Sequence, residues 1–578
     1  SRVKPRRSAA HAAAASAAAV AVPNIVGAGV DAIAAAAAGA SAEAGAEAGT
    51  GRLAVLLALL LGATALEWLT NRARLHIMAD VGTRIVVDIR GDLFDHLQTL
   101  SLRFYDHYKV GRLMSRIMGD VTVLRDFVTW AIVGTARSVL TLLFILITLY
   151  ARNWRLATLV LMVLPVMAVA TRMWSRRARE AWREVRRRIA IINGYLNETV
   201  TGVRVIQSFT REPANEDIFD DLNRRHLDAN LRAARLSAVF FPTVDVLGAV
   251  AVGIVVAYGA LAPDRALSAG DLTAFALLVD RFFDPIRELS RRYNQLLATM
   301  AASERIFELL DLDPDVQDDP EAYDAPDLAG RVEFRDVWFA YGDEPVLRGI
   351  ALDVPAGTTV ALVGETGAGK TSIVNVLARF YDIRSGSVFV DGHDIRRLTK
   401  RSLRRQMGTV LQETYLFSGT IEENIRYGRP GADGAEIVAA AQAVGVDEFV
   451  QRLPEGYGSA VGERGVNLSV GQRQLVAFAR ALLADPRILI LDEATSSVDT
   501  ETEMVIRRAL EHLLAGRTAF VIAHRLSTIV NADQIVVLSA GQVVEHGTHA
   551  QLLARRGAYY GLYTMQWAPR AAAAAALG

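Results

Sequence analysis

The glycine-rich segment Gly364–Thr371 has the clearest capacity for chemistry in the sequence. It reads Gly-Glu-Thr-Gly-Ala-Gly-Lys-Thr, follows the apolar run Val360–Val363 and precedes a stretch with helical periodicity, Ser372–Phe380. Glycines let several backbone N–H groups turn towards one ligand, and a helix start adds the positive end of its dipole. We expect a phosphate site in which Lys370 reaches the β- and γ-phosphates of a nucleotide. The expected contacts are Gly364, Glu365, Thr366, Gly367, Ala368, Gly369, Lys370, Thr371 and Ser372.

Two adjacent carboxylates, Asp492 and Glu493, end the apolar run Ile488–Leu491. In open α/β sheets, ligands bind at the carboxyl ends of the strands, where these side chains would lie. Asp492 suits Mg²⁺ binding together with the hydroxyl of Thr371. Glu493 points the other way along the strand and suits a general base or a water-orienting role. A plain acidic strand end is the alternative, and the presence of a phosphate loop argues against it.

A second candidate anion site lies at Leu468–Gln472, which reads Leu-Ser-Val-Gly-Gln and precedes the helical stretch Arg473–Ala484. Ser469 is a good N-cap, and Gly471 lets a ligand approach the backbone closely. The free N–H groups of a helix start bind anions. The domain would therefore hold two phosphate-type sites although it needs one nucleotide. Taken alone, the motif is equally well explained as an ordinary capped helix.

In order and spacing, these motifs resemble the nucleotide-binding domain of ABC transporters over Arg331–Trp567. Leu468–Gln472 resembles the signature motif of that family, with Val470 where glycine is more usual. The resemblance implies ATP and Mg²⁺ as cofactors. It also implies that two nucleotide-binding domains sandwich ATP head to tail. Ser469, Gly471 and Gln472 of one domain would then contact the ATP that the phosphate loop of the other domain holds.

Further residues take their roles from this resemblance. Tyr341 is similar to the aromatic residue that stacks on adenine, and Gln412 to the glutamine that touches Mg²⁺ and senses the membrane domain. Glu463 matches an exporter-specific loop, Asp499 a D-loop, and His524 the switch histidine at the γ-phosphate. Without that context a sheet-edge aromatic, a strand end and a core histidine are the alternatives. The implied catalytic set is Glu493, His524 and Gln412, and the implied Mg²⁺ ligands are Thr371, Gln412 and Asp492.

The sequence from Arg331 onwards predicts the α/β domain that positions these residues. Short β-branched runs alternate with helical patterns, which is typical of a largely parallel sheet with antiparallel pieces at its start. The stretch Asp311–Gly330 is rich in Pro and Asp and is a plausible linker before it. The expected strands are Val332–Phe339, Thr358–Val363, Ser387–Val390, Thr409–Leu411, Ile488–Leu491, Ala519–Ile522 and Gln534–Leu538.

Apolar runs of near-spanning length dominate the first half of the chain. About 20 apolar residues cross the hydrocarbon of a bilayer, and about six such runs are present. Two charged stretches, Arg72–Arg137 and Arg172–Arg235, keep helical periodicity and predict helices that continue beyond the bilayer, with separate soluble helices as the alternative. The apolar runs are the Ala-rich stretch Ala9–Ala40, then Leu53–Leu69, Val139–Tyr150, Leu156–Ala170, Leu236–Ala262 and Leu272–Phe283.

The distribution of arginine predicts the orientation of these helices. Arginine is abundant in the N-terminal stretch, in the two charged stretches and after Arg287, whereas the remaining loops are short. Basic loops face the cytoplasm, so we expect both termini and the ATPase domain on the cytoplasmic side of a bacterial cell membrane. The basic N-terminus could also begin a signal peptide, but further apolar segments follow without a persuasive cleavage site.

The membrane half also resembles ABC exporters, though more loosely. Gly111–Ile117 and Val203–Glu212 are similar to the first and second interior loops, and Ser303–Leu310 to the exit of the sixth helix. A membrane domain followed by an ATPase implies half of an exporter, paired with a second half-transporter in a homodimer or a heterodimer. The resemblance also implies that helices near Gly111–Arg125 and Ser208–Ile218 dock on a groove around Gln412.

We therefore expect a multidomain chain: an all-α transmembrane domain of about six long helices at 1–310, a linker at 311–330, an α/β P-loop ATPase domain at 331–567 and a tail at 568–578. The implied function is ATP-driven export of a small amphipathic molecule, drug or lipid by alternating access. A peptide or siderophore transporter subunit in a heterodimer is the alternative. Membrane lipids are expected partners and nucleic acid is not, because ATPases of chromosome structure or repair have coiled coils instead of apolar spans.

Composition adds few constraints on the substrate. The chain has no Cys, which excludes disulfides and thiolate metal sites, and its 63 basic and 63 acidic residues balance. Charges inside apolar runs cost about 2.5–3.5 kcal/mol each, so they should face a wet pathway or a partner. Such charges are Glu67, Asp245, Asp280 and Arg281, and the aromatic residues Phe240, Phe241, Phe282 and Phe283 fit either an amphipathic substrate or plain packing.

Overall fold

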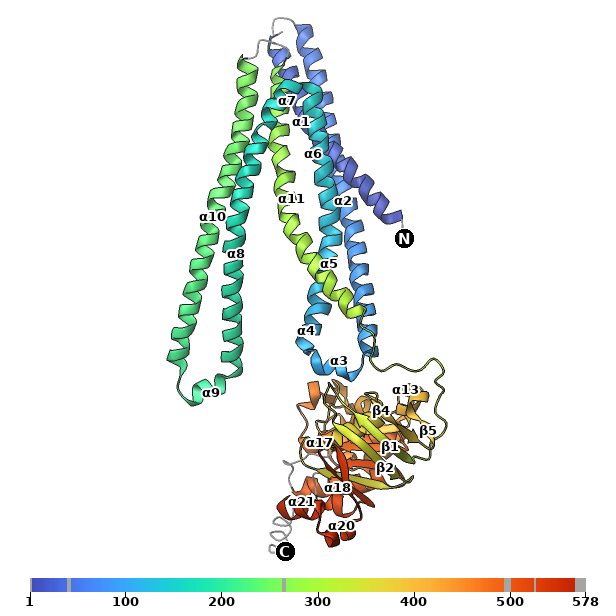
Figure 1. Cartoon of the computed structure of the whole chain (residues 1–578). Helices are drawn as coiled ribbons and strands as arrows, with labels where there is room; N and C mark the ends of the chain where they lie inside the picture. Colours follow the sequence, from blue (N-terminus) through green and yellow to red (C-terminus); the bar gives the residue numbers. More distant parts are fainter. Residues whose placement is uncertain (1–2, 39–42, 262–266, 493–499, 524–525, 567–578) are drawn as a thin grey trace. The chain divides into compact units, whose positions relative to one another are not determined.

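The chain forms two compact units, shown in a computed structural model that describes residues 3–38, 43–261, 267–492, 500–523 and 526–566 (Figure 1). The first unit comprises Ser1–Asp95 and Leu113–Asp311, and the second comprises His96–Arg112 and Leu312–Gly578. A short piece of the expected membrane domain therefore belongs to the same compact unit as the ATPase domain.

Long α-helices build the first unit, because its apolar runs and charged extensions keep one helical period. Two π-helical turns, η1 (Arg116–Asp120) and η2 (Phe127–Ile132), interrupt the helical path between α4 and α6. The helices are α1 (Val3–Ala38), α2 (Glu43–Thr99), α4 (Val110–Ser115), α5 (Val121–Asp126), α6 (Val133–Arg152), α7 (Trp154–Leu161), α8 (Val163–Thr201), α9 (Val203–Ser208), α10 (Glu212–Leu261) and α11 (Ala269–Leu310).

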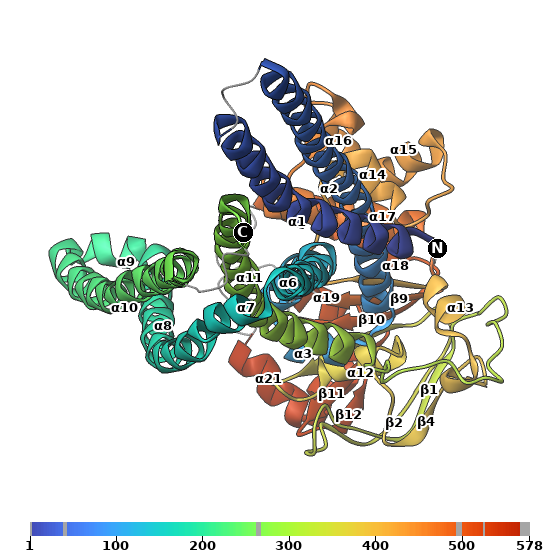
Figure 2. The ribbon, with the colours of Figure 1, turned by 90° about the horizontal axis from the view of Figure 1, so that it is seen from above.

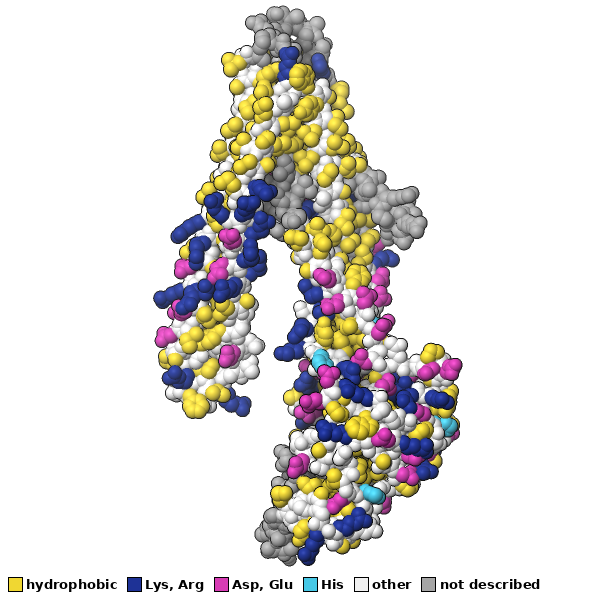
Figure 3. Space-filling view, viewed as in Figure 1, with side chains coloured by type: hydrophobic (Ala, Val, Ile, Leu, Met, Phe, Trp, Pro, Cys, Tyr) yellow, Lys and Arg dark blue, Asp and Glu magenta, His cyan; other side chains and the backbone are white. Residues whose placement is uncertain are grey.

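Five helical segments of the described chain are long and apolar enough to cross a membrane: Ala13–Ala37, Gly51–Thr99, Val110–Arg152, Trp154–Thr201 and Glu212–Leu261. The sixth expected run lies in α11, which also carries Pro285 and several charged residues. Residues from α6, α7, α10 and α11 share one apolar core. Apolar side chains cover the upper parts of these helices, and Lys and Arg gather lower on α8 and α10 (Figure 3).

Helices α8 and α10 run side by side well past their apolar segments (Figures 1 and 2). Small and branched side chains make this possible: Ala178 and Val185 of α8 and Ala229 and Ala233 of α10 are buried. The prediction that the charged stretches are helical continuations is confirmed for Arg172–Arg235, apart from the short connection around α9.

Two main sheets build the second unit. A four-stranded sheet has the order β2-β1-β4-β5 and is antiparallel, and a six-stranded sheet has the order β12-β11-β3-β10-β9-β6. Strands β11, β3, β10, β9 and β6 are parallel, and β12 pairs antiparallel with β11 at the edge. The strands are β1 (Val332–Phe339), β2 (Leu347–Val354), β3 (Thr359–Gly364), β4 (Ser385–Val390), β5 (His393–Asp394), β6 (Met407–Val410), β9 (Ile488–Asp492), β10 (Thr518–Ile522), β11 (Gln534–Ser539) and β12 (Gln542–Gly547).

Both faces of the six-stranded sheet are buried, and each face builds a different core. Side chains alternate along a strand, so Val360 and Leu362 of β3 enter one core while Ala361 and Val363 enter the other. The first core also contains Ile373 of α12 (Lys370–Leu377) and the four-stranded sheet. The second contains α17 (Val470–Leu483) and α18 (Thr500–Leu514). Helices α12 and α17 therefore cover opposite faces of the sheet.

The remaining helices of the second unit are short. They are α3 (Leu102–His107), α13 (Lys400–Arg405), α14 (Ile421–Arg426), α15 (Gly434–Ala443), α16 (Val446–Val450), α19 (Leu526–Val530), α20 (His549–Arg555) and α21 (Ala558–Gln566). The seven expected strands are all present within two residues of their predicted bounds. Strands β2 and β12 were not expected from the sequence.

Candidate nucleotide site

The phosphate loop connects β3 to α12 through backbone conformations that glycine adopts most easily. Gly367 has φ +85° and Gly369 has φ +101°, and the N-cap of α12 is Gly369. A Cβ at Gly364 would collide with the carbonyl of Leu538 on β11, whereas a Cβ at Gly367 would meet nothing within 4 Å. The loop is thus held tightly against the sheet at its start and open at its tip.

Lys370 lies folded over this loop. Its Nζ donates hydrogen bonds of 2.8 Å to the carbonyl oxygens of Gly364 and Glu365. Burial lowers the pKa of this ammonium, and the nearby carboxylate of Asp492 opposes that shift. An incoming phosphate could replace the two carbonyls as the acceptor, because a lysine ammonium prefers an anionic partner. The residues present therefore fit a nucleotide phosphate.

The residues expected to bind Mg²⁺ follow strand ends at one edge of the sheet. Asp492 ends β9 and is aligned with Ile522 of β10, which pairs in turn with Leu362 of β3. Gln412 follows β6, the neighbour of β9, and Thr371 is in the first turn of α12. The described part of the chain has no cluster of three or more His, Cys, Asp or Glu residues that could hold a metal. Asp492, Thr371 and Gln412 would offer a carboxylate, a hydroxyl and an amide oxygen to a Mg²⁺ ion.

Tyr341 lies beside the phosphate-loop helix. Its hydroxyl accepts hydrogen bonds from Ser372 Oγ at 3.2 Å and Asn375 Nδ2 at 3.1 Å. Its ring meets the edges of Phe339 and Tyr381, with centroids 4.8 and 5.0 Å apart. The structure thus brings Tyr341 next to α12, and stacking on adenine stays a prediction.

The second candidate anion site is a well-formed helix start. Ser469 Oγ accepts from the N–H of Gln472 at 3.2 Å, and the Gln472 side chain accepts from the N–H of Ser469 at 2.9 Å. This capping box engages both polar side chains expected to contact nucleotide. Ser469 and Val470 are exposed while Gly471 is buried. The turn therefore presents its backbone and the serine hydroxyl to an approaching ligand.

Gln412 and Glu463 line one cavity of about 490 Å³. Their roles stay predictions from the resemblance. Arg473 lines the cavity too, and its guanidinium donates to the carbonyl oxygens of Gly465 at 3.2 Å and Leu468 at 2.7 Å. The contact ties the start of α17 to the preceding loop. Sequence reasoning missed Arg473, although its position directly after the Leu468–Gln472 motif was visible.

Residues of the first interior loop contact the ATPase domain within the second unit. Asp106 of α3 accepts a hydrogen bond from the Tyr381 hydroxyl, and burial together with this carboxylate raises the pKa of Tyr381. Ser101 donates to Asp315 at 3.2 Å. The expectation that Gly111–Arg125 and Ser208–Ile218 dock on a groove around Gln412 stays a prediction.

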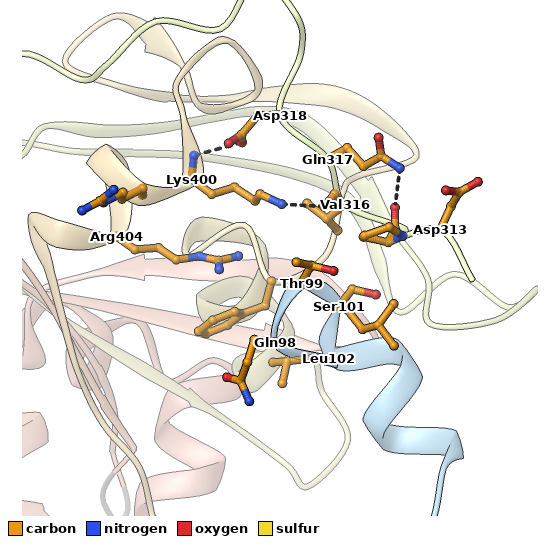
Figure 4. A pocket seen from close by; sticks show the side chains of 14 residues that line it. Gln98, Thr99, Ser101, Leu102, Asp313, Val316, Gln317, Asp318, Lys400 and Arg404 are labelled. Carbon is orange, nitrogen blue, oxygen red and sulfur yellow. Dashed lines mark hydrogen bonds between the residues drawn. The ribbon is translucent and has the colours of Figure 1, made fainter. Parts of the chain in front are cut away.

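A polar cavity of about 790 Å³ lies beside this contact (Figure 4). The end of α2, the segment Asp313–Asp318 and α13 line it. Lys400 spans it: its Nζ donates to the carbonyl of Val316 at 2.7 Å, and its backbone N–H donates to Asp318 at 3.0 Å. Burial lowers the pKa of the Lys400 ammonium. The linker is thus fastened to the ATPase domain.

Three expected site residues, Glu493, Asp499 and His524, lie outside the described residues. Their roles remain predictions from the sequence.

Comparisons with known proteins find one family in both halves of the chain. Residues 9–286 match the family described as ABC transporter transmembrane region, and residues 347–496 match the family described as ABC transporter. An uncharacterized ABC transporter ATP-binding protein, YknV of Bacillus subtilis (strain 168), is 43% identical over 90% of this chain and 87% of its own. An ATP-dependent lipid A-core flippase of Syntrophus aciditrophicus (strain SB) is 39% identical over 85% and 82%.

Two further matches extend the comparison. A fatty acid ABC transporter ATP-binding/permease protein of Mycobacterium bovis is 41% identical over 88% of this chain and 80% of its own. The solved structure of a bacterial Atm1-family ABC exporter with ATP bound superimposes with a TM-score of 0.80 and 29% identity, covering 98% of this chain and 99% of that one.

Proposed function

The chain belongs to the ABC transporter family, as a membrane domain fused to an ATPase domain, and we propose that it exports a small amphipathic molecule, drug or lipid across the cell membrane. Relatives named as a lipid A-core flippase, a fatty acid transporter and a putative multidrug exporter support this substrate class. The apolar spanning segments support a membrane location, with the ATPase domain on the cytoplasmic side.

The observation that carries the proposal is the placement of two candidate anion sites at helices that cover opposite faces of one sheet. The phosphate loop leads into α12 on one face, and the capped start of α17 belongs to the other. One nucleotide cannot readily occupy both sites of the same chain. A second half-transporter supplies the missing site when two domains meet head to tail, so that Ser469 of each faces the phosphate loop of its mate.

Each residue of the site then has a separate role in ATP hydrolysis. Lys370 and the loop N–H groups would hold the phosphates of ATP. Thr371, Gln412 and Asp492 would hold Mg²⁺, which would offset negative charge on the phosphates. Glu493 orients the attacking water and takes its proton. His524 contacts the γ-phosphate.

Closure and release of the paired domains drive the membrane helices between inward- and outward-facing states. Asp106 and Tyr381 support this coupling, because they join the first interior loop to the ATPase domain within one unit.

Transport in proteoliposomes tests the proposal. The purified chain in inverted vesicles should move fluorescent amphiphiles of several classes into the lumen when ATP is added outside, and a Lys370→Met variant should not. Absence of ATP-dependent movement for every amphiphile, from a protein that hydrolyses ATP, would contradict it. The same preparation decides between a homodimer and a heterodimer, because a homodimer is active without an added partner.

A further inference from the structure

An arginine-lined cavity of about 540 Å³ lies inside the membrane unit. Four arginines and three carboxylates line it, contributed by α2, α6 and α11: Arg74, Arg137, Arg281 and Arg292, with Glu67, Asp284 and Glu288. The described part of the lining therefore carries one formal positive charge in excess. Charged groups next to membrane-spanning segments mark functional sites when they face a cavity.

Internal ion pairs account for only part of this charge. Arg137 donates to Glu67 at 3.1 Å, and Arg292 pairs with Glu288, which also accepts from Ser138 at 3.0 Å. These two pairs engage two of the four arginines, although Arg292 Nε is buried without a hydrogen-bond partner in the described structure.

The other two arginines have neutral acceptors. Arg74 donates to the side-chain oxygen of Asn71 at 2.7 Å, and Arg281 donates to the backbone carbonyl of Ala19. Arg74 is 8% exposed, and its Nε is buried without a hydrogen-bond partner in the described structure. A buried guanidinium donor without an acceptor is unfavourable. The described residues give Arg74 Nε no acceptor, so an oxygen of a ligand could supply one.

Glycine on α6 leaves room for one of these guanidinium groups. A Cβ at Gly134 would overlap the guanidinium of Arg292, which donates to the carbonyl of Ala131 at 3.1 Å. A larger residue here would require this flexible side chain to move.

The position of the cavity along the helices indicates the shape of its ligand. Glu67 and Arg74 stand where the apolar run of α2 ends, Gly134–Ser138 precede the apolar run of α6, and Arg281–Arg292 follow most of the apolar run of α11. All three helices therefore change from apolar to charged at the cavity. A ligand with a polar head here and an apolar tail beside the apolar runs would match both environments.

We infer that this cavity binds the anionic head of an amphiphile, a carboxylate or a phosphate, and that Arg74 and Arg281 are its specificity-determining residues. Arginine is suited to such a head because its planar donor fork matches both oxyanions. The inference rests on the proposed function and narrows its substrate class from amphiphiles in general to those with a negative head.

Binding to the wild-type protein in nanodiscs of phosphatidylcholine tests the charge preference without any substitution. Radiolabelled oleate should bind and be displaced by unlabelled oleate or phosphatidic acid, and oleyl alcohol and oleylamine, which have the same tail, should compete at least about tenfold less well. If only unlabelled oleate displaces the radiolabel, the cavity prefers a carboxylate head. If phosphatidic acid displaces it as well, the cavity accepts either a carboxylate or a phosphate. Equal competition by oleyl alcohol or oleylamine overturns the inference.

Substitutions locate the site. Arg74→Gln and Arg281→Gln should each weaken oleate binding about tenfold or more. Arg84→Gln should not, because Arg84 is on the same helix α2 but exposed, with its only described ion pair to Asp80. Unchanged oleate affinity in both cavity variants contradicts the inference.

The transport assay separates this inference from the proposed function. ATP-dependent movement of neutral or cationic amphiphiles, with none of oleate, leaves export standing and refutes the anionic head. Oleate binding without movement of any amphiphile supports the site and refutes export.

Discussion

Arg379 Nη2 donates a hydrogen bond to the backbone carbonyl of Gln317 at 2.8 Å, so the segment that follows α11 is fixed to the chain just beyond the phosphate-loop helix. The same guanidinium is 3% exposed, and it also donates to the carbonyl of Leu398 at 2.9 Å and pairs with Asp318 at 3.3 Å. A single buried cation thus joins the linker, α12 and the strand region before α13.

Replacing Arg379 should loosen this junction. Arg379→Ala leaves several carbonyl groups without their donor and removes one of the two donors to Asp318, which should cost about 3 kcal/mol and lower the melting temperature of the ATPase domain by about 5–10 °C. Hydrogen exchange of residues 312–320 should accelerate in the full-length protein. Arg331→Ala is the control, because it removes an exposed arginine paired with Asp353 and should change little. Wild-type exchange of the linker in Arg379→Ala would contradict the prediction.

Removing one hydroxyl should weaken the coupling between hydrolysis and transport. Tyr381→Phe keeps the ring contacts with Phe339 and Tyr341 but loses the hydrogen bond to Asp106. We expect fewer substrate molecules moved per ATP hydrolysed, measured in proteoliposomes with both rates recorded together. Tyr457→Phe provides a matched control, because its hydroxyl donates to Asp447 at 2.8 Å elsewhere in the domain. An unchanged transport-to-ATPase ratio in Tyr381→Phe would refute the role.

Ser469, which caps α17, should affect the rate of ATP hydrolysis as well as the stability of the helix. Ser469→Ala and Thr548→Ala each remove the side chain of a capping box and should destabilise the domain equally, by about 1 kcal/mol. Only Ser469→Ala should lower ATPase activity, by at least about tenfold, because in the proposed pair its hydroxyl would face the nucleotide held by the second chain.

Mixed pairs give a sharper test of that arrangement. A mixture of Ser469→Ala and Lys370→Met chains contains pairs in which one of the two composite sites keeps both its lysine and its serine. Such mixtures should regain activity that neither variant shows alone. Failure to complement, in pairs verified by differential tags, would argue against sites shared between two chains.

The expected general base can be tested although it lies outside the described residues. Glu493→Gln should lower the ATPase rate by about 10²–10⁴-fold while ATP still binds, because the amide cannot accept the proton of water. The paired chains should then stay together in ATP during gel filtration. Glu455→Gln, at an exposed loop glutamate, is the control. ATPase activity near the wild-type rate in Glu493→Gln would exclude the assigned base.

The nucleotide site could be predicted from sequence because its motifs are local. The glycine spacing that precedes Lys370 describes a loop, and the capping box Ser469–Gln472 describes a helix start, within a few residues each. Most strands were predictable for the same reason. Strand β12 was missed because its residues are at most half buried, and β2 because Gly349 interrupts its apolar alternation.

Contacts between distant segments could not be predicted. Asp106 and Tyr381 are 275 residues apart, and nothing in either local pattern marks them as partners. The arginines of the cavity come from α2, α6 and α11, where each looks like one more basic residue beside an apolar run. Their grouping depends on the packing of the helices, which a single sequence does not reveal. Of the charges expected to line a pathway, Glu67 and Arg281 do line this cavity, and Asp245 and Asp280 are not in its lining.

The alternation of Val360–Val363 between two cores limits how the gene can change. Exchanges among branched aliphatic residues keep each side chain in an apolar setting and should be tolerated. Deleting or inserting one codon within these four would turn every later side chain of the strand to the opposite face and shift the loop that follows. Natural variation in this stretch should therefore alter the identity of its residues freely while leaving their number constant.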